Sequence, residues 1–156
     1  EKSGLFFFNP PIGRGYDDGL VTAIAVCRML DRNPDRSMAD LYRALPLTYG
    51  SPTMSPHCPD EVKYDVIARV VERFTAMRDA GETVAGHPIA DLVTVNGVRV
   101  VADDGTWGLV RASSNKPELV VVVESPVSEE RKLDMFRAVD AILRENGEVG
   151  DYNQSI

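Results

Sequence analysis

Few residues in this sequence would mark a disulfide scaffold, a membrane protein or a zinc protein. Only two cysteines, Cys27 and Cys58, occur among 156 residues, too few for a disulfide framework or a four-ligand zinc site. No apolar run approaches the roughly 20 residues of a membrane-spanning helix, and the first run, residues 5–8, is too short for a signal peptide. We therefore expect a protein of the reducing cytoplasm with no membrane partner.

Basic residues are also in short supply. The 17 lysines and arginines are outnumbered by 24 acidic residues, which gives a net charge of -7. Residues 1–59 are balanced, with six of each sign, whereas residues 60–156 carry eleven basic and eighteen acidic residues. A nucleic-acid-binding surface normally requires an excess of positive charge, so we expect no nucleic-acid partner. Any anion site in the second part must act at short range against an unfavourable overall field.

A cluster of prolines divides the chain. Proline has no backbone N–H group and therefore interrupts helices and strands. The change from a balanced to an acidic charge composition occurs at the same place. We predict a piece of one domain over residues 1–50, a hinge over 51–59, and a second domain over 60–156 that ends in a loose tail after Gly147. The four prolines are Pro46, Pro52, Pro56 and Pro59.

The pattern of the first part predicts a short buried strand over residues 5–8 and two helices. One helix is capped by an aspartate at 17–18 and runs to about Leu30, and a shorter helix begins at Ser37. Apolar positions cover much of the first helix, so we expect it to be largely buried. Three elements alone cannot bury this much apolar surface. We therefore expect the fragment to self-associate through residues 5–8.

The second part predicts an α+β domain. Helices with one apolar face begin at Asp60 and Ser128. Strands joined by tight turns form antiparallel sheets, so we predict a four-stranded antiparallel sheet with both helices on one face. Asn96-Gly97 indicates a two-residue type I′ turn between two of the strands. The four expected strands cover residues 92–95, 98–101, 106–111 and 118–124.

Polar groups gather between the last two predicted strands. Arg111 stands at the start of this loop, and Ser113, Ser114 and Asn115 follow it. A guanidinium binds phosphate through two parallel hydrogen bonds, and hydroxyl, amide and backbone N–H groups can donate to the remaining oxygens. The same residues also suit an ordinary hairpin loop, so the residues alone leave both interpretations open. We expect Trp107, four residues earlier, to lie in the core rather than to serve as a stacking platform.

No catalytic group is evident. His57 and His87 both neighbour proline, and neither has a serine or acidic residue at a spacing that would define a catalytic dyad. We therefore expect neither a catalytic residue nor a metal ligand in this chain.

Three blocks of sequence, in order, match the pattern of one enzyme superfamily. Residues 1–4 (EKSG) precede an apolar segment, as in a G-E-x-S-G-H sugar-binding loop. Residues 16–19 (YDDG) precede an apolar helix, and residues 107–113 (WGLVRAS) match the phosphate-binding loop W-G-L-V-R-A-S-N-T-x-P. In these blocks the chain resembles the α-D-phosphohexomutase superfamily, in particular the C-terminal part of bacterial phosphomannomutase/phosphoglucomutase.

The resemblance implies a four-domain isomerase that interconverts the 1-phosphates and 6-phosphates of mannose or glucose through a phosphoserine and a bisphosphorylated intermediate, with magnesium. Residues 1–50 would end its third, α/β sugar-binding domain. Residues 60–156 would form its fourth, phosphate-binding domain, which has a TATA-box-binding-protein-like fold. The family's phosphoserine and magnesium loops belong to the first two domains. The resemblance therefore implies an inactive isolated chain whose partners are a phosphosugar and the missing N-terminal domains.

Individual roles follow from the same resemblance. Leu5 replaces the usual histidine of the sugar loop, so that contact is lost. Phosphoglucosamine mutases usually carry Gln where Lys2 stands and Gly where Ser114 stands, which favours the mannose/glucose enzyme over that alternative. A stand-alone anion-binding module is the alternative outside the enzymes. The resemblance assigns phosphate binding to Arg111, Ser113, Ser114 and Asn115, and sugar binding to Glu1 and Ser3.

Overall fold

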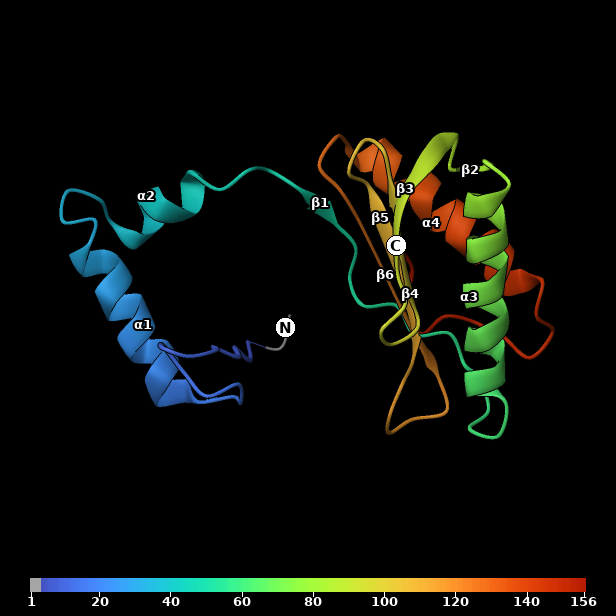
Figure 1. The fold of residues 1–156 in the computed structure, drawn as a ribbon, viewed down its shortest axis with the longest axis horizontal. Coiled ribbons are helices and arrows are strands. Elements are labelled where there is room, and N and C mark those ends of the chain that lie inside the picture. Colours follow the sequence, from blue (N-terminus) through green and yellow to red (C-terminus); the bar gives the residue numbers. More distant parts are fainter. Residues whose placement is uncertain (1–3) are drawn as a thin grey trace. The chain divides into compact units, whose positions relative to one another are not determined.

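The structure, a computed structural model, describes residues 4–156 and divides the chain into two compact units (Figure 1). The first unit ends at Pro46 and the second begins at Leu47. The division therefore falls four residues before the predicted end of the first part. None of the described helices combines the length and the apolar character that crossing a membrane requires.

The first unit contains two capped helices, α1 (Gly19–Asp31) and α2 (Met38–Arg43). The Asp18 carboxylate accepts hydrogen bonds from the first backbone N–H groups of α1, at 2.9 and 3.1 Å. At α2, the Ser37 hydroxyl and the Asp40 carboxylate cap each other's backbone N–H groups, which forms a capping box. Both starts follow the sequence because these short polar side chains satisfy N–H groups that the helix leaves unpaired.

The apolar side chains of the first unit stay exposed. No residue of α1 is buried, contrary to the expectation for this helix. The strand expected over residues 5–8 is reduced to a single bridge between Phe7 and Asp17, and Phe6 and Phe7 are 50% and 59% exposed. A strand needs a paired neighbour and an apolar helix needs a surface to cover, and the described part of this unit supplies neither. Self-association through residues 5–8 stays a prediction.

The second unit is built on a six-stranded antiparallel sheet, which confirms the α+β prediction. The strands lie in the order β1-β6-β5-β4-β3-β2, and the two outermost strands, each of two residues, extend the four that were predicted. Ala85 and Gly86, between β2 and β3, both have positive φ, the combination typical of a type I′ turn. The strands are β1 (Tyr49–Gly50), β2 (Thr83–Val84), β3 (His87–Val93), β4 (Val98–Ala102), β5 (Trp107–Ala112) and β6 (Leu119–Ser125).

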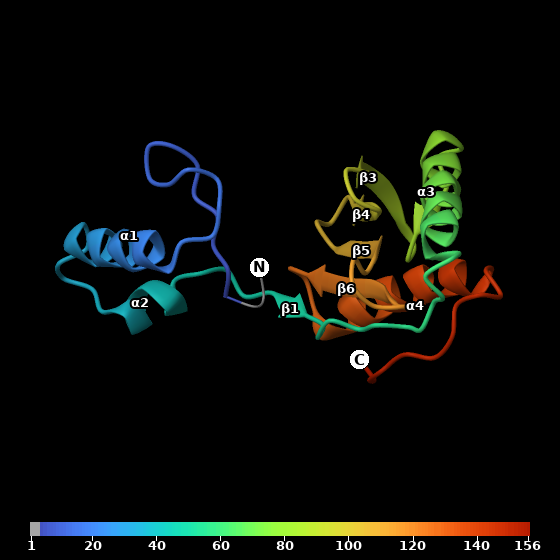
Figure 2. The ribbon, with the colours of Figure 1, turned by 90° about the horizontal axis from the view of Figure 1, so that it is seen from below.

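Helices α3 (Lys63–Asp79) and α4 (Glu129–Arg144) cover one face of this sheet (Figures 1 and 2). Side chains alternate along β4 and β5, so that every second residue is buried beneath the helices. A Cβ on Gly108 of β5 would lie 2.7 Å from a methyl group of Val139 in α4, so the glycine allows the helix to approach closely. The largest fully buried side chains include Met54, Val66, Val70, Phe74, Val98, Val100, Val110, Leu119, Val121, Met135 and Leu143.

The predicted hinge at residues 51–59 is wrong. Met54 and Cys58 are fully buried, and Met54 exchanges two backbone hydrogen bonds with Val121 of β6, at 2.9 and 2.8 Å. Proline cannot donate to a strand, but along an edge only alternate residues face the neighbouring strand. The segment therefore donates to β6 from the N–H groups of Ser51 and Met54, and Pro56 takes part only as an acceptor, from the Leu119 N–H at 2.9 Å.

The tail after Gly147 is also packed rather than loose. The Gly150 N–H donates to the His57 carbonyl at 2.8 Å, and the Tyr152 ring lies 5.4 Å from that of Phe136. The Tyr152 hydroxyl donates to Asp140 at 2.9 Å. An apolar ring with a polar tip suits such a half-buried position, so Tyr152 ties the tail to α4.

An ion pair joins the β4–β5 turn to α4. Arg131 Nε donates to Asp104 Oδ2 at 2.6 Å, with side chains 12% and 15% exposed. Burial by itself raises the pKa of the Asp104 carboxyl, but hydrogen bonds from Arg131 and Thr106 outweigh it and lower the pKa from 3.8 to about 2. The folded state therefore favours the charged carboxylate.

This lowered pKa predicts a loss of stability in acid. Because the folded pKa lies below the unfolded one, the contribution is complete above about pH 4 and disappears as the pH falls through 2. At 1.36 kcal/mol per pKa unit it amounts to about 2 kcal/mol. Urea titrations at pH 5 and pH 2 should show that wild type loses about this much more stability than Asp104→Asn. Equal losses in the two proteins would contradict the prediction.

The difference in burial predicts different protection in the two units. Backbone amides of β4, β5 and β6 lie in a paired, covered sheet, whereas α1 and α2 contain no buried residue. Native-state hydrogen exchange should give protection factors roughly 100-fold higher in the sheet than in these two helices. Equal protection of both units in a monomer would show that the first unit is stabilised by contacts beyond those seen here.

Candidate functional site

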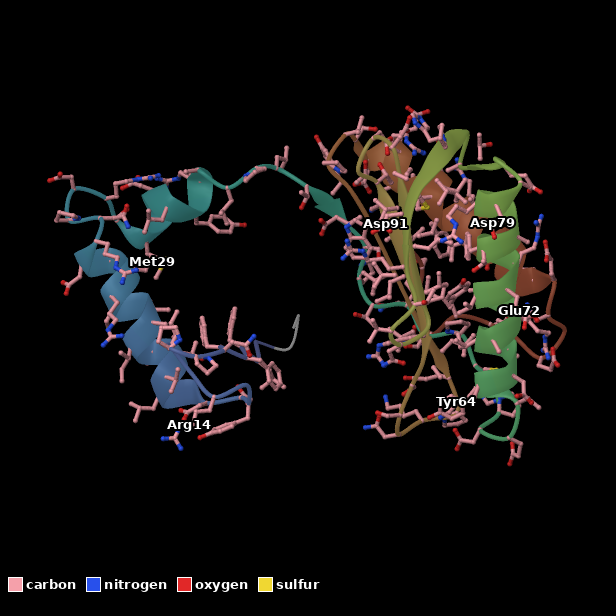
Figure 3. All side chains as sticks on the ribbon, viewed as in Figure 1. Arg14, Met29, Tyr64, Glu72, Asp79 and Asp91 are labelled. Carbon is pink, nitrogen blue, oxygen red and sulfur yellow. The ribbon has the colours of Figure 1, made fainter. Side chains whose placement is uncertain are left out.

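The β5–β6 loop, residues 113–118, lies at the end of the sheet where α3 begins. In a consecutive antiparallel sheet alternate connections share an end, so the β3–β4 loop, residues 94–97, lies there too. Figure 3 shows Tyr64, at the N-terminal end of α3, beside the same end of the unit. Two segments that are distant from it in sequence, the β3–β4 loop and the start of α3, thus lie at the same end of the sheet as the predicted phosphate loop.

The base of the β5–β6 loop is firmly anchored. The last residue pair of the two strands is Ala112 with Leu119, and the Ser113 N–H continues the ladder by donating to the Glu118 carbonyl at 3.0 Å. The Pro117 carbonyl accepts from the Cys58 N–H at 2.9 Å. By contrast, the backbone N–H groups of residues 114–116 donate to no acceptor within the described chain. The loop therefore presents free N–H groups on a fixed base, as an anion nest does.

All four predicted phosphate-binding residues lie on this loop or at its start. The Arg111 guanidinium donates to the adjacent Ala112 carbonyl at 3.1 Å. Ser113 is 6% exposed, and the Ser114 hydroxyl donates to Asn115 Oδ1 at 3.1 Å. This last contact leaves the amide hydrogens of Asn115 without a described acceptor, so the loop offers donors of three chemical kinds. This placement leaves the assigned role of the four residues a prediction.

Arg111 stands out electrostatically. Nine of the eleven lysines and arginines in residues 60–156 form an ion pair within 4.0 Å, from Lys132 with Glu129 at 2.5 Å to Lys116 with Glu118 at 3.8 Å. The two that pair with no described carboxylate are Arg99 and Arg111. In a unit with seven excess negative charges, these are the two cations whose charge no described carboxylate neutralises at short range.

Arg99 is a candidate that the sequence reasoning missed. It lies opposite Leu109 in the β4–β5 register, so it is a diagonal neighbour of Arg111 on the uncovered face of the sheet. Its guanidinium lies 5.4 Å from the centre of the Trp107 ring. The alternation in Val98-Arg99-Val100 already indicated that Arg99 points away from the core.

Trp107 does not lie in the core, contrary to expectation. It is partly exposed on the sheet face opposite the helices and packs against Arg99. In β5 the alternate residues Gly108 and Val110 face the helices instead, so the period of two places Trp107 and Arg111 on the same side. A cation over an indole ring is attracted to it, which helps to orient Arg99.

Gly97 allows the β3–β4 loop to pack closely against the backbone of β5 at Val110 and Arg111. The predicted type I′ turn at Asn96-Gly97 is wrong, because Gly97 has positive φ but Asn96 does not. A Cβ on Gly97 would lie 2.1 Å from the Val110 carbonyl oxygen and 2.8 Å from Arg111 Cα. Four residues, 94–97, therefore connect the strands, and the loop rests on the backbone of Arg111.

The predicted sugar-binding residues Glu1 and Ser3 lie outside the described residues. Gly4 next to them has a φ of 85°, and Leu5 is 38% exposed. The structure therefore says nothing about their role, which stays a prediction.

His87 has acidic neighbours that its sequence context did not indicate. Its Nδ1 lies 2.8 Å from Asp103 Oδ1, and its Nε2 lies 3.9 Å from Asp104 Oδ2. Ligand atoms of the three residues fall within 4.8 Å of one another, but Asp104 already accepts hydrogen bonds from Arg131 and Thr106. The group joins the start of β3 to the β4–β5 turn, at the opposite end of the sheet from Arg111, and it forms a hydrogen-bond network there with Arg131 and Thr106.

The fold of the second unit and its β5–β6 loop correspond to a known family of domains. Residues 61–147 match the family model described as phosphoglucomutase/phosphomannomutase, C-terminal domain. The chain belongs to this family. The match begins just before α3 and ends just after α4, so it covers both helices, strands β2 to β6 and the β5–β6 loop.

Individual relatives agree with this assignment. Phosphomannomutase/phosphoglucomutase of Pseudomonas putida is 34% identical over 88% of the chain and 27% of the relative. Phosphopentomutase of Thermococcus kodakarensis is 30% identical over 76% of the chain and 24% of the relative. A probable phosphoglucosamine mutase of Methanopyrus kandleri is 33% identical over 86% and 26%. The chain thus spans about a quarter of the length of these relatives.

A solved structure shares the fold. A phosphoglucomutase/phosphomannomutase family protein of Burkholderia thailandensis superposes with a TM-score of 0.67 and 23% identity. The superposition covers 96% of this chain and 29% of that one.

The contact at Gly97 predicts an unusual sensitivity to substitution. Gly86 has the same φ of 80°, but a Cβ there would meet nothing within 4 Å, so Gly86→Ala is a matched control for backbone strain alone. We expect Gly86→Ala to cost about 1 kcal/mol, and Gly97→Ala to cost about 1–3 kcal/mol more because its methyl overlaps the β5 backbone. Urea denaturation checks this, and equal costs would show that the β3–β4 loop moves away freely.

Proposed function

We propose that this chain is the C-terminal part of a phosphohexomutase that interconverts hexose 1-phosphate and 6-phosphate, with mannose and glucose as the sugars. In this proposal the β5–β6 loop binds the phosphate that is not being transferred. The observation that supports it most is Arg111, a cation with no described carboxylate partner, at the start of a loop with free N–H groups.

The phosphate would be held by short-range donors. Arg111 supplies a planar pair of N–H groups, and Ser113, Ser114 and Asn115 supply hydroxyl and amide donors. Hydrogen bonds to a charged group are worth roughly 1.5–3 kcal/mol each, which is enough to bind an anion in an acidic domain. Arg99, the other cation without an acidic partner, adds positive charge on the same face.

Such a loop suits a reaction in which the substrate binds in two orientations. A hexose bisphosphate intermediate must turn so that either phosphate can be transferred, and the phosphate that stays behind is the constant feature. A fixed loop on a separate unit can bind that phosphate in both orientations. Closure of the unit over the sugar would then exclude water from the transfer.

The chemical step would require segments beyond this chain. The relatives are about four times longer, and we propose that their remaining domains supply the phosphoserine and magnesium. Magnesium prefers a site made of oxygen ligands. The described residues offer the His87, Asp103 and Asp104 group, which includes an imidazole and a carboxylate bound to Arg131, so this group does not fit a magnesium site.

The sugar is the part of the proposal on which the relatives differ. Their names include phosphoglucosamine mutase and phosphopentomutase as well as phosphomannomutase/phosphoglucomutase. Phosphoglucosamine is therefore the second candidate. Assays of a full-length enzyme containing this chain on mannose, glucose, glucosamine and pentose 1-phosphates would decide between them.

The proposal predicts that Arg111 dominates phosphate binding. Arg111→Ala should weaken hexose 1-phosphate binding about 10–100-fold, since a tenfold change corresponds to about 1.4 kcal/mol. Arg111→Lys should recover only part, because an ammonium keeps the charge but loses the planar pair of donors. The affinities can be measured by calorimetric titration beside thermal melts, which should change little for a residue outside the core.

Arg137 offers a matched control for general charge. It is exposed and paired with Asp134 on α4, so Arg137→Ala removes the same charge elsewhere and should leave the affinity unchanged. If Arg111→Ala binds as tightly as wild type, the loop is an ordinary hairpin and the proposed phosphate site is wrong.

The isolated chain should have no mutase activity. The proposal assigns the phosphoryl donor and the metal ligands to other domains, so the purified 156 residues should not convert glucose 1-phosphate to glucose 6-phosphate in a coupled assay. Measurable turnover, with contaminating mutase excluded, would overturn this division of roles. Phosphate binding without any dependence on the sugar would instead favour a stand-alone anion-binding module.

A further inference from the structure

A buried lysine lies directly behind the candidate phosphate loop. Lys63, the first residue of α3, has a side chain that is only 4% exposed. Its Nζ donates to the Lys116 carbonyl at 3.0 Å and to Asp60 Oδ1 at 2.6 Å. Lys116 is 53 residues away in the sequence, so this contact links the start of a helix to the tip of the β5–β6 loop.

This position is an unfavourable one for a lysine. Burial removes an ammonium from water, and the N-terminus of a helix carries partial positive charge that disfavours a further cation. Asp60 offsets part of both costs. The Lys116 carbonyl supplies the remaining described acceptor, and the Pro117 carbonyl beside it is held by the Cys58 N–H at 2.9 Å. Two successive carbonyls of the loop are thereby held, one by the first residue of α3 and one by the segment that precedes it.

We propose that Lys63 is a positioning residue for the phosphate site, an inference that rests on the proposed function. By binding the Lys116 carbonyl, it fixes the part of the loop that directly follows Ser114 and Asn115. The donors of these residues are then ordered before phosphate arrives. Pre-ordering lowers the conformational entropy lost on binding and so raises affinity, although Lys63 itself never touches the phosphate.

The chain contains a matched lysine without this connection. Lys132 on α4 has a side chain that is 7% exposed and pairs with Glu129, three residues earlier, at 2.5 Å. Its ammonium has no described hydrogen bond to the β5–β6 loop. Removing either ammonium therefore removes a similar ion pair, between a buried lysine and a carboxylate that is 60% exposed, and only the Lys63 change releases the loop.

The test uses the 15N-labelled 156-residue chain and inorganic phosphate. Amide chemical-shift titrations give the affinity at Ser113–Asn115, and heteronuclear NOEs give the mobility of residues 114–116. We expect Lys63→Met to weaken phosphate binding roughly threefold to tenfold and to lower the NOEs of the loop. Lys132→Met should change neither quantity. Lys63→Arg keeps a donor and should restore at least part of the affinity.

The outcomes separate the inference from the proposed function. If wild type binds phosphate at the loop and Lys63→Met binds equally well with unchanged NOEs, the inference is overturned and the phosphate site stands. If wild type shows no saturable shifts at the loop, the proposed function fails, whatever the loop NOEs show. If Lys63→Met does not fold, Lys63→Gln replaces it with the same expectations. Equal losses in Lys63→Met and Lys132→Met would also overturn the inference, since they would reflect general destabilisation.

Discussion

The antiparallel pairing of β5 with β6 is the constraint on which the second unit depends. Their register, from Trp107 opposite Glu124 to Ala112 opposite Leu119, fixes which side chains face the helices and where the connecting loop begins. Val110 and Val121, opposite each other, both contribute to the core under α3 and α4. A slip of one residue would bury Arg111 and expose these valines. The register that fills the core therefore also places the guanidinium beside the loop.

The segments packed around this pair reinforce the same end of the sheet. Residues 51–56 pair with β6, the β3–β4 loop rests on Arg111 through Gly97, and Lys63 binds the Lys116 carbonyl. Each contact spans a large separation in sequence, so each depends on the sheet being formed. The loop between β5 and β6 consequently has a fixed base and free N–H donors, an arrangement that would suit the proposed anion site.

The ion pairs of the second unit single out the same face of the sheet. Carboxylates are in excess throughout the second unit, and they neutralise nearly all of its cations locally. Arg99 and Arg111 are the exceptions among its described residues, and both belong to the sheet face that no helix covers. In the proposed function, this selective pairing is what would allow a short-range anion site in an acidic domain, because guanidinium groups without a carboxylate partner keep donors available while the global field contributes nothing favourable.

Local signals in the sequence were enough for the α+β class, the helix starts at Asp18, Ser37 and Ser128, and the loop containing Arg111 and Ser113. These depend on capping, on periodicity and on a short motif, all of which act over a few residues. The strand at residues 5–8 failed for the complementary reason. A strand exists only with a paired neighbour, and the described first unit provides a single bridge.

Tertiary structure alone decided the features that join distant segments. Four prolines in fourteen residues indicated a hinge, yet the residues between them pair with β6, because an edge strand needs donors only at alternate positions. Trp107 and the acidic partners of His87 were misplaced or missed for a similar reason, since cross-strand neighbours are set by register rather than by spacing along the chain. Lys63 is the clearest case. The sequence shows only a lysine near the start of a predicted helix. The packing of that helix against the β5–β6 loop is what brings the Lys63 ammonium to the carbonyl of Lys116.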